Sequence, residues 1–411
     1  MDRIAKIIGR EILNAKGRPT VEAELTTESG IKVTASVPSG TSRGKYEAYE
    51  LYDGETRYGG LGTRKAASNI SKEISYALRG MDVTEQSRID SVLRELDGTS
   101  DKSKLGGNAM LAASVAAAKA GAASQKIAPY VYLRQQGVRV KIPDIVATVI
   151  AGGVFSTSGM EFEDYMMILH GFDAFPDELE ALCTMRKELE AGLRGQYGDF
   201  PEDGGALAPP CSSSAEGFQW ILRTASALGY EQNIKLGLDV AASELWDKDS
   251  RCYKMAGGKN LTSEELAEYY RELCIKYPLG FIEDGFEQDD FDGFARLMKM
   301  VPQIQIVGDD LFATNVERLK IGINRKCANG VLLKINQIGT VTEAIETSNL
   351  ARQNDMDVIV SLRSGETTDD FIADLAVAVG ASQIKLGSPV RAERNAKYNR
   401  LLKIWEDLEQ Q

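Results

Sequence analysis

The chain has 411 residues, and 60 acidic against 48 basic side chains give it a formal net charge of −12 at pH 7. This acidic balance argues against a nucleic-acid surface or an anionic-membrane surface. Five cysteines without a Cys-x-x-Cys pair indicate neither a disulfide framework nor a zinc site, and no segment approaches the length of a membrane span. We therefore expect a cytoplasmic protein in a reducing compartment.

The first third of the chain predicts a small α+β domain. Residues 4–37 alternate between apolar and polar side chains and contain two turn signals, which is typical of an antiparallel meander with one buried face. Residues 63–125 have a helical pattern that ends in an alanine-rich helix over 108–124. We place the domain boundary so that the first domain spans residues 1–130 and the second spans residues 131–411.

A loop of small and polar residues follows the meander at positions 38–45. It fails the Walker nucleotide-binding pattern, because only three residues separate Gly40 from Gly44 and because Tyr46 follows the lysine. The loop is either a mobile lid that carries hydroxyl groups or a plain surface loop.

The second domain repeats an apolar run followed by a helix-length segment. The charged or polar ends of five runs stand at positions 283, 309, 334, 361 and 385, which are 24 to 27 residues apart. This period suits strand-plus-helix units, and a capping box at Thr262-Ser263-Glu264-Glu265 opens one of the helices. Because parallel strands present their carboxyl ends at one face, we predict a (β/α) barrel; a doubly wound open sheet has the same alternation and is the alternative.

Three carboxylates stand at the carboxyl ends of different predicted strands: Asp239, Glu283 and Asp309. Hard oxygen ligands that converge in this way suit Mg²⁺, although carboxylates at strand ends also cap nearby helices. Lys334 follows one unit later, within Gly330 to Gln337, where a metal's positive field would depress its pKa. The pattern therefore indicates a base that removes a proton next to a metal-bound carboxylate.

Further cationic and hydroxyl groups follow the last two predicted strands. Arg363, Ser364 and Lys385 form a set that could hold a phosphate or a carboxylate, and barrels often bind phosphate at this place. Salt-bridged scaffold residues are the alternative.

Over nearly its whole length the sequence resembles enolase, the phosphopyruvate hydratase family. The resemblance rests on Lys6 to Ile12, Pro19 to Glu24, Leu96 to Thr99, Lys102 to Lys104, Ile282 to Gly285, Val307 to Phe312 and Ala396 to Asn399. It implies an α/β fold in which an enolase-type (β/α)8 barrel follows a smaller α+β domain, a Mg²⁺ cofactor, a homodimer and a small phosphorylated carboxylate as substrate.

The resemblance also implies roles for individual residues. Asp239, Glu283 and Asp309 correspond to metal ligands, and Lys334 corresponds to the base at C2. Ser42 resembles the lid serine that reaches a second metal. The substrate-binding positions are Ser42, Glu163, Asp310, Arg363, Ser364 and Lys385, and the positions of the two catalytic glutamates are occupied by Asp164 and Asp203.

The other half of the implied site departs from the family at four positions. A loop histidine is replaced by Phe155 and a phosphate-side histidine by Leu362, while Asp164 and Asp203 are each one methylene shorter than the glutamates that they replace. Such a shortening moves a carboxyl group by roughly 1 Å, which can cost about a hundredfold in rate. His170, the one histidine of the chain, does not stand at either histidine position.

We therefore expect a Mg²⁺-dependent enolase-type hydro-lyase that acts on 2-phosphoglycerate or a close analogue. In this hypothesis Lys334 takes the C2 proton, and Asp203, aided by Asp164, helps the β-hydroxide to leave. Two alternatives remain: the same dehydration of a phosphonate analogue, with Phe155 and Leu362 reshaping the pocket, and a non-catalytic enolase-like binding protein. The retained Asp239, Glu283, Asp309 and Lys334 argue against the last.

Overall fold

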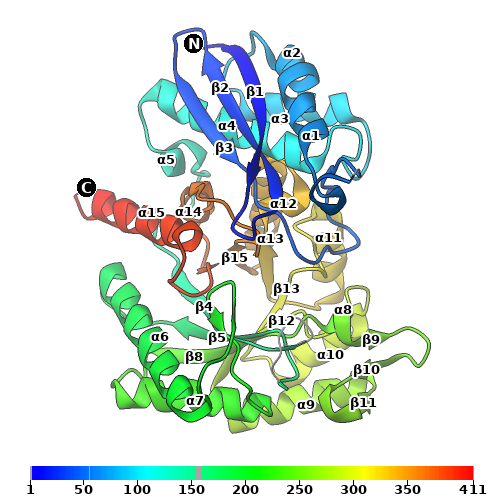
Figure 1. Ribbon diagram of the computed structural model, residues 1–411, viewed down its shortest axis with the longest axis vertical. Coiled ribbons are helices and arrows are strands. Elements are labelled where there is room, and N and C mark those ends of the chain that lie inside the picture. Colours follow the sequence, from blue (N-terminus) through cyan, green and yellow to red (C-terminus); the bar gives the residue numbers. More distant parts are fainter. Residues whose placement is uncertain (1, 55, 154–158, 411) are drawn as a thin grey trace.

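The computed structural model describes residues 2–54, 56–153 and 159–410 and shows a small domain beside a larger barrel (Figure 1). The small domain holds an antiparallel sheet in the order β1-β2-β3, with β1 at Ile4–Leu13, β2 at Pro19–Thr27 and β3 at Lys32–Ser36. The predicted meander is therefore confirmed.

Helices follow the sheet as the sequence indicated. They are α1 (Arg64–Asn69), a π-helical stretch (Ile70–Ile74), α2 (Ser75–Leu78), α3 (Gln86–Asp97), α4 (Gly107–Gln125) and α5 (Pro129–Leu133). The alanine-rich helix is α4, which contacts β2 and β3; its small side chains allow this close approach. The predicted boundary at residue 130 falls within α5, and α5 contacts both α4 of the small domain and the barrel helix α14 (Phe371–Ala378). The division at residue 130 therefore stays a prediction.

The barrel is closed by eight strands. Their order is β16-β15-β14-β13-β12-β8-β5-β4, and β16 pairs with β4 to complete the ring. The strands are β4 (Asp144–Ala151), β5 (Asp164–Leu169), β8 (Ile234–Asp239), β12 (Leu279–Glu283), β13 (Gln305–Gly308), β14 (Gly330–Leu333), β15 (Asp357–Ser361) and β16 (Gln383–Lys385). Closure rules out the doubly wound open sheet.

One strand runs against the expected parallel arrangement. β5 is antiparallel to both of its neighbours, β4 and β8, whereas the pairs from β8 through β16 to β4 are parallel. The reversal brings the beginning of β5 to the face where the other strands end, so that Asp164 lies opposite Asp239. The same reversal sends His170, which follows β5, to the other end of the barrel.

The barrel interior is filled by apolar side chains. These are Val146, Met166, Ile168, Phe281, Val307, Leu332 and Ile359, each from a barrel strand. Outside lie α6 (Phe175–Tyr197), α7 (Ser214–Ala227), α9 (Ser263–Lys276), α10 (Phe291–Met300), α11 (Val316–Arg325), α13 (Val341–Gln353), α14 and α15 (Ala392–Glu409). The predicted capping box at the start of α9 is present, with Thr262 and Glu265 as its two members.

Shorter elements complete the chain. The hairpin β6 (Glu202–Asp203) and β7 (Ala206–Leu207) extends the barrel sheet beside β4, and β9 (Trp246–Asp247), β10 (Cys252–Lys254) and β11 (Asn260–Leu261) form a separate sheet. The helices α8 (Ala242–Leu245) and α12 (Ile335–Ile338) follow β8 and β14 directly. None of the described helices combines the length and apolar character needed to cross a bilayer.

Candidate active site

A cavity of about 150 Å³ lies where the carboxyl-end face of the barrel meets the small domain. The residues that line it include Ser42, Glu163, Asp164, Asp203, Asp239, Asp309, Asp310, Lys334, Arg363, Ser364 and Lys385. Glu283, whose carboxylate contacts the Lys385 ammonium, completes the predicted set. The structure thus gathers every predicted site residue at one place.

Two lysine ammonium groups contact the three carboxylates that are predicted to bind metal, and they offset part of the negative charge. Lys385 Nζ lies 2.8 Å from Asp239 Oδ2 and 2.7 Å from Glu283 Oε2. Lys334 Nζ donates to Asp309 Oδ2. All of these groups are buried or nearly so. Each stands at or directly after the carboxyl end of its barrel strand, namely Asp239 on β8, Glu283 on β12, Asp309 after β13, Lys334 after β14 and Lys385 on β16.

The charges around Lys334 set its protonation. Burial alone would lower the pKa of the ammonium, but the charges of Asp309 and Glu283 act together against burial, so the pKa lies above its ordinary value. A divalent cation held by the same carboxylates would act in the opposite direction. Gln337 Nε2 donates to the other oxygen of Asp309 at 2.7 Å and so fixes the orientation of this carboxylate.

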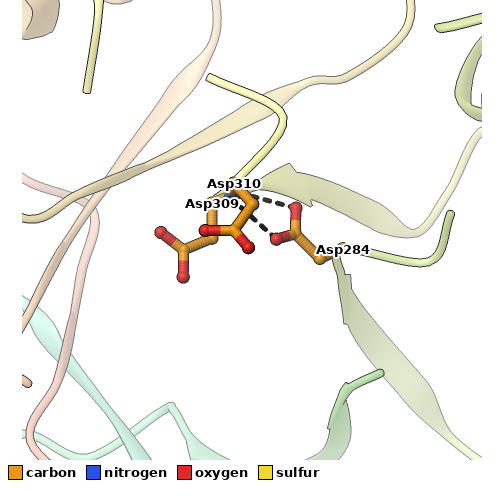
Figure 2. Close-up of side chains that lie close together, drawn as sticks. All are labelled: Asp284, Asp309 and Asp310. Carbon is orange, nitrogen blue, oxygen red and sulfur yellow. Dashed lines mark hydrogen bonds between the residues drawn. The ribbon is translucent and has the colours of Figure 1, made fainter. Parts of the chain in front are cut away.

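Asp284 orients the two aspartates that follow β13. Its two carboxylate oxygens accept hydrogen bonds from the backbone N–H groups of Asp309 at 2.9 Å and Asp310 at 2.7 Å, as Figure 2 shows. One oxygen from each of these three carboxylates lies within 4.8 Å of the others. Burial and the charge of Asp309 raise the pKa of Asp310 to about 7.

The predicted metal ligands offer a suitable donor set. Carboxylate oxygens are the ligands that Mg²⁺ takes in proteins. Oε1 of Glu283 is buried and has no hydrogen-bond partner among the described residues, while its other oxygen contacts Lys385. An orphaned buried carboxylate oxygen is costly unless a cation or donor meets it, so the free oxygen of Glu283 suits a divalent cation. Of the three predicted ligands, Asp309 alone belongs to the closely spaced group with Asp284 and Asp310. The assignment of Asp239, Glu283 and Asp309 as the metal ligands stays a prediction.

Arg363 is held by the small domain. Its Nη1 lies 2.8 Å from Oε2 of Glu47, and its Nη2 donates to the backbone carbonyl of Ser42 at 2.9 Å. The side chains of Glu47 and Arg363 are only 2% and 6% exposed. The residue expected to grip substrate therefore also fastens the loop that carries Ser42.

The loop at positions 38–45 covers the cavity. Thr41 and Ser42 line the cavity, and Thr41 Oγ1 shares a 2.7 Å hydrogen bond with Ser364 Oγ. At the far end of the loop, the Tyr46 hydroxyl donates to Asp289 Oδ1 at 2.8 Å, and the Arg318 guanidinium stands over the Tyr46 ring. These contacts place the loop as a lid over the pocket; its mobility stays a prediction.

Two acidic residues come from the reversed strand and the turn before it. Thr148 Oγ1 donates to Asp164 Oδ2 at 3.0 Å, and Lys385 Nζ lies 3.8 Å from the same oxygen. Burial raises the pKa of Asp164 above its usual range. Burial and the Asp239 charge raise the pKa of Glu163 well above its usual range.

The remaining departures lie around the cavity rim. Asp203 lines the cavity from the β6–β7 hairpin, and its side chain is about half exposed, at 48%. Leu362 presents a buried apolar side chain to the cavity where the family has a histidine. Phe155, the other expected replacement, lies within residues 154–158, outside the described residues.

The fold and the site together define a barrel enzyme in which a buried lysine adjoins a carboxylate set suited to a divalent metal. Comparison with known proteins narrows this class. Residues 4–133 match the family model for the enolase N-terminal domain, and residues 139–411 match the model for the enolase C-terminal TIM barrel domain. The chain belongs to the enolase family and is a carbon–oxygen lyase of the hydro-lyase type.

Proteins named enolase from three archaea illustrate the likeness. The Methanopyrus kandleri protein is 45% identical, over 99% of this chain and 96% of that relative. The Methanocaldococcus jannaschii protein is 43% identical over 98% and 95%, and the Pyrococcus furiosus protein is 43% identical over 99% and 95%.

Sequence reasoning missed several residues that shape the site. Glu47 and Lys16 come from the small domain, and nothing in their local pattern indicates a partner in the barrel. Asp284 had a signal, because it directly follows Glu283 in a matching motif, and Gln337 stands three residues after Lys334. A short helix begins just after Lys334, so residues three positions apart turn toward the same carboxylate.

Proposed function

We propose that this chain dehydrates 2-phosphoglycerate to phosphoenolpyruvate and uses Mg²⁺ as its divalent ion. The observation that carries the proposal is the contact of the buried Lys334 ammonium with Asp309, beside Asp239 and Glu283. When bound, the ion would neutralise the negative charge that develops on the substrate carboxylate.

The chain's own residues supply the proton steps. In its neutral form Lys334 accepts the C2 proton as the C2–H bond breaks. The C3–O bond then breaks, and the leaving hydroxide takes a proton from Asp203 and departs as water. Arg363, Ser364 and Lys385 supply cations and a hydroxyl to hold the anionic groups, and the lid residue Ser42 closes the cavity against bulk water.

The retained half of the site favours this reaction over the alternatives. Neither the phosphonate analogue nor a non-catalytic binding role gains support from the relatives, which carry the name enolase. The homodimer and the cytoplasmic location belong to the same proposal and rest on the resemblance to the family. Sedimentation of the purified protein at micromolar concentration would test the dimer.

The direct test mixes the purified protein with Mg²⁺ and 2-phosphoglycerate and follows the ultraviolet absorbance of the enol product. A parallel sample in D₂O reports exchange of the C2 proton by NMR. We expect both signals from the unaltered protein and neither from Lys334→Ala, with Lys320→Ala, an exposed lysine on α11, as the matched control. Exchange without turnover would reject 2-phosphoglycerate dehydration while leaving Lys334 as the base.

A further inference from the structure

Lys16 links the small domain to the residue proposed as the general acid. Its Nζ lies 3.8 Å from Oδ1 of Asp203 and donates a 2.9 Å hydrogen bond to Oγ1 of Thr41. Thr41 in turn shares its hydrogen bond with Ser364. The Lys16 ammonium therefore contacts both Asp203 and the lid residue Thr41, and Thr41 connects it to the hydroxyl of Ser364.

The turn that carries Lys16 is built to hold it still. The buried Asn14 accepts hydrogen bonds at its side-chain oxygen from the N–H groups of Lys16 at 2.9 Å and Arg18 at 3.1 Å. Gly17 has a φ of +66°, a conformation that suits glycine, and it completes the turn. The N–H of Ala15 donates to the carbonyl of Glu366 at 2.8 Å, which fixes the turn to the barrel.

The hairpin that carries Asp203 is also fixed, but only through its backbone and its neighbours. Arg186 Nη2 donates to the Gly205 carbonyl at 3.0 Å and lies 3.3 Å from Glu202 Oε1. Arg394 packs so closely against Gly204 that an added Cβ would lie 2.6 Å from its Nη2. These contacts leave the direction of the Asp203 side chain undetermined.

Among the described residues, Lys16 is the one group with a polar contact to the Asp203 carboxylate. An acid that must deliver its proton to a leaving hydroxide has to be held within a fraction of an ångström of its place. With half of its side chain exposed, Asp203 otherwise has solvent on that side. The orientation of the acid therefore depends on a cation from the other domain.

Resting on the function proposed above, we infer that Lys16 is a positioning residue that orients Asp203 and couples its orientation to seating of the lid. When the loop at 38–45 leaves the cavity, Lys16 loses Thr41 and the ammonium is free to turn away from Asp203. Asp203 is thus oriented for proton transfer when the lid is closed and Thr41 is hydrogen-bonded to Ser364. The base, Lys334, belongs to a separate set of contacts and does not depend on Lys16.

The test compares Lys16→Met, Lys16→Arg and a matched control, Lys32→Met, an exposed lysine of β3 in the same domain. For Lys16→Met we expect kcat for dehydration to fall by about 10- to 100-fold, with exchange of the C2 proton in D₂O and the KM nearly unchanged. Lys16→Arg should recover most of the dehydration rate, and Lys32→Met should match the unaltered protein. Equal loss of exchange and dehydration in Lys16→Met, or no loss of either, would overturn the inference.

A second measurement does not depend on turnover. In protein labelled with ¹³C at aspartate Cγ, the Asp203 resonance is identified by its absence in Asp203→Asn. We expect this resonance to move in Lys16→Met and in Thr41→Val but not in Lys32→Met. An unmoved resonance in Lys16→Met would refute the contact even if the unaltered protein failed to turn over 2-phosphoglycerate, a failure that would count against the proposed function alone.

Discussion

The buried ion pair between Glu47 and Arg363 predicts a large and separable effect of one substitution. Glu47→Gln keeps the shape of the side chain and removes the charge that compensates a guanidinium with 6% of its side chain exposed. Breaking a buried pair by removing one partner costs about 3–5 kcal/mol. Arg363 keeps the carbonyl of Ser42 at 2.9 Å and Oδ1 of Asn336 at 3.4 Å, so we expect the lower end, about 3 kcal/mol.

The assay is urea unfolding followed by circular dichroism, with Glu22→Gln as the control. Glu22 pairs with Arg10 at 3.5 Å on the surface of the small sheet, where Arg10 is 43% exposed, and such pairs contribute about 0–1 kcal/mol. If Glu47→Gln lowers the free energy of unfolding by no more than the control does, the buried pair does not join the two domains as we describe.

The pH dependence of this effect has a definite sign. Burial raises the pKa of Glu47, but the charge and hydrogen bond of Arg363, together with the hydrogen bond from the Gly44 N–H, outweigh burial and leave the pKa below its usual value. A depressed carboxyl pKa stabilises the folded protein above the unfolded pKa of about 4.3, and this contribution is lost as the pH falls through the folded pKa. The difference between the unaltered protein and Glu47→Gln should therefore be complete at pH 7 and shrink below about pH 4.

Three further outcomes are expected. Glu283→Gln should weaken Mg²⁺ binding in calorimetry by at least about tenfold, because it removes a carboxylate whose Oε1 has no other partner among the described residues; unchanged affinity would place the ion elsewhere. Burial raises the pKa of Glu178 to about 8, so the fold loses stability as the pH rises from about 4.3 to 8. Glu178→Gln should abolish this loss, worth up to about 5 kcal/mol, whereas the exposed Glu180→Gln should not. Tyr46→Phe removes the hydrogen bond to Asp289, which contributes about 1 kcal/mol to the closed state of the lid. We therefore expect KM to rise about fivefold, with kcat at saturation little changed. An unaltered KM would show that this bond does not hold the lid.

Local sequence patterns were sufficient to predict the barrel strands and the polar residues at their ends. An apolar run that ends in a carboxylate, repeated at a strand-plus-helix period, indicated the barrel strands, and the carboxyl ends of parallel strands necessarily share a face. The sequence alone therefore predicted that Asp239, Glu283, Asp309 and Lys334 meet at one face, and the structure brings them together there; their roles stay predictions. The sequence did not decide whether the loop at 38–45 is a lid or a plain surface loop, because a loop of small polar residues has no pattern that indicates what it contacts.

Tertiary structure decided the direction of β5 and the contacts between the domains. A buried strand has the same apolar pattern in either direction, so the sequence of β5 does not say that it is antiparallel or that Asp164 begins rather than ends it. Glu47 and Arg363 are 316 positions apart, and Lys16 meets Asp203 across the same domain boundary. Residue identity determined which chemistry the chain offers. The packing of one domain on the other determined which charged groups contact Asp203 and the lid, since a charge at the surface of one domain has no partner until the other domain covers it.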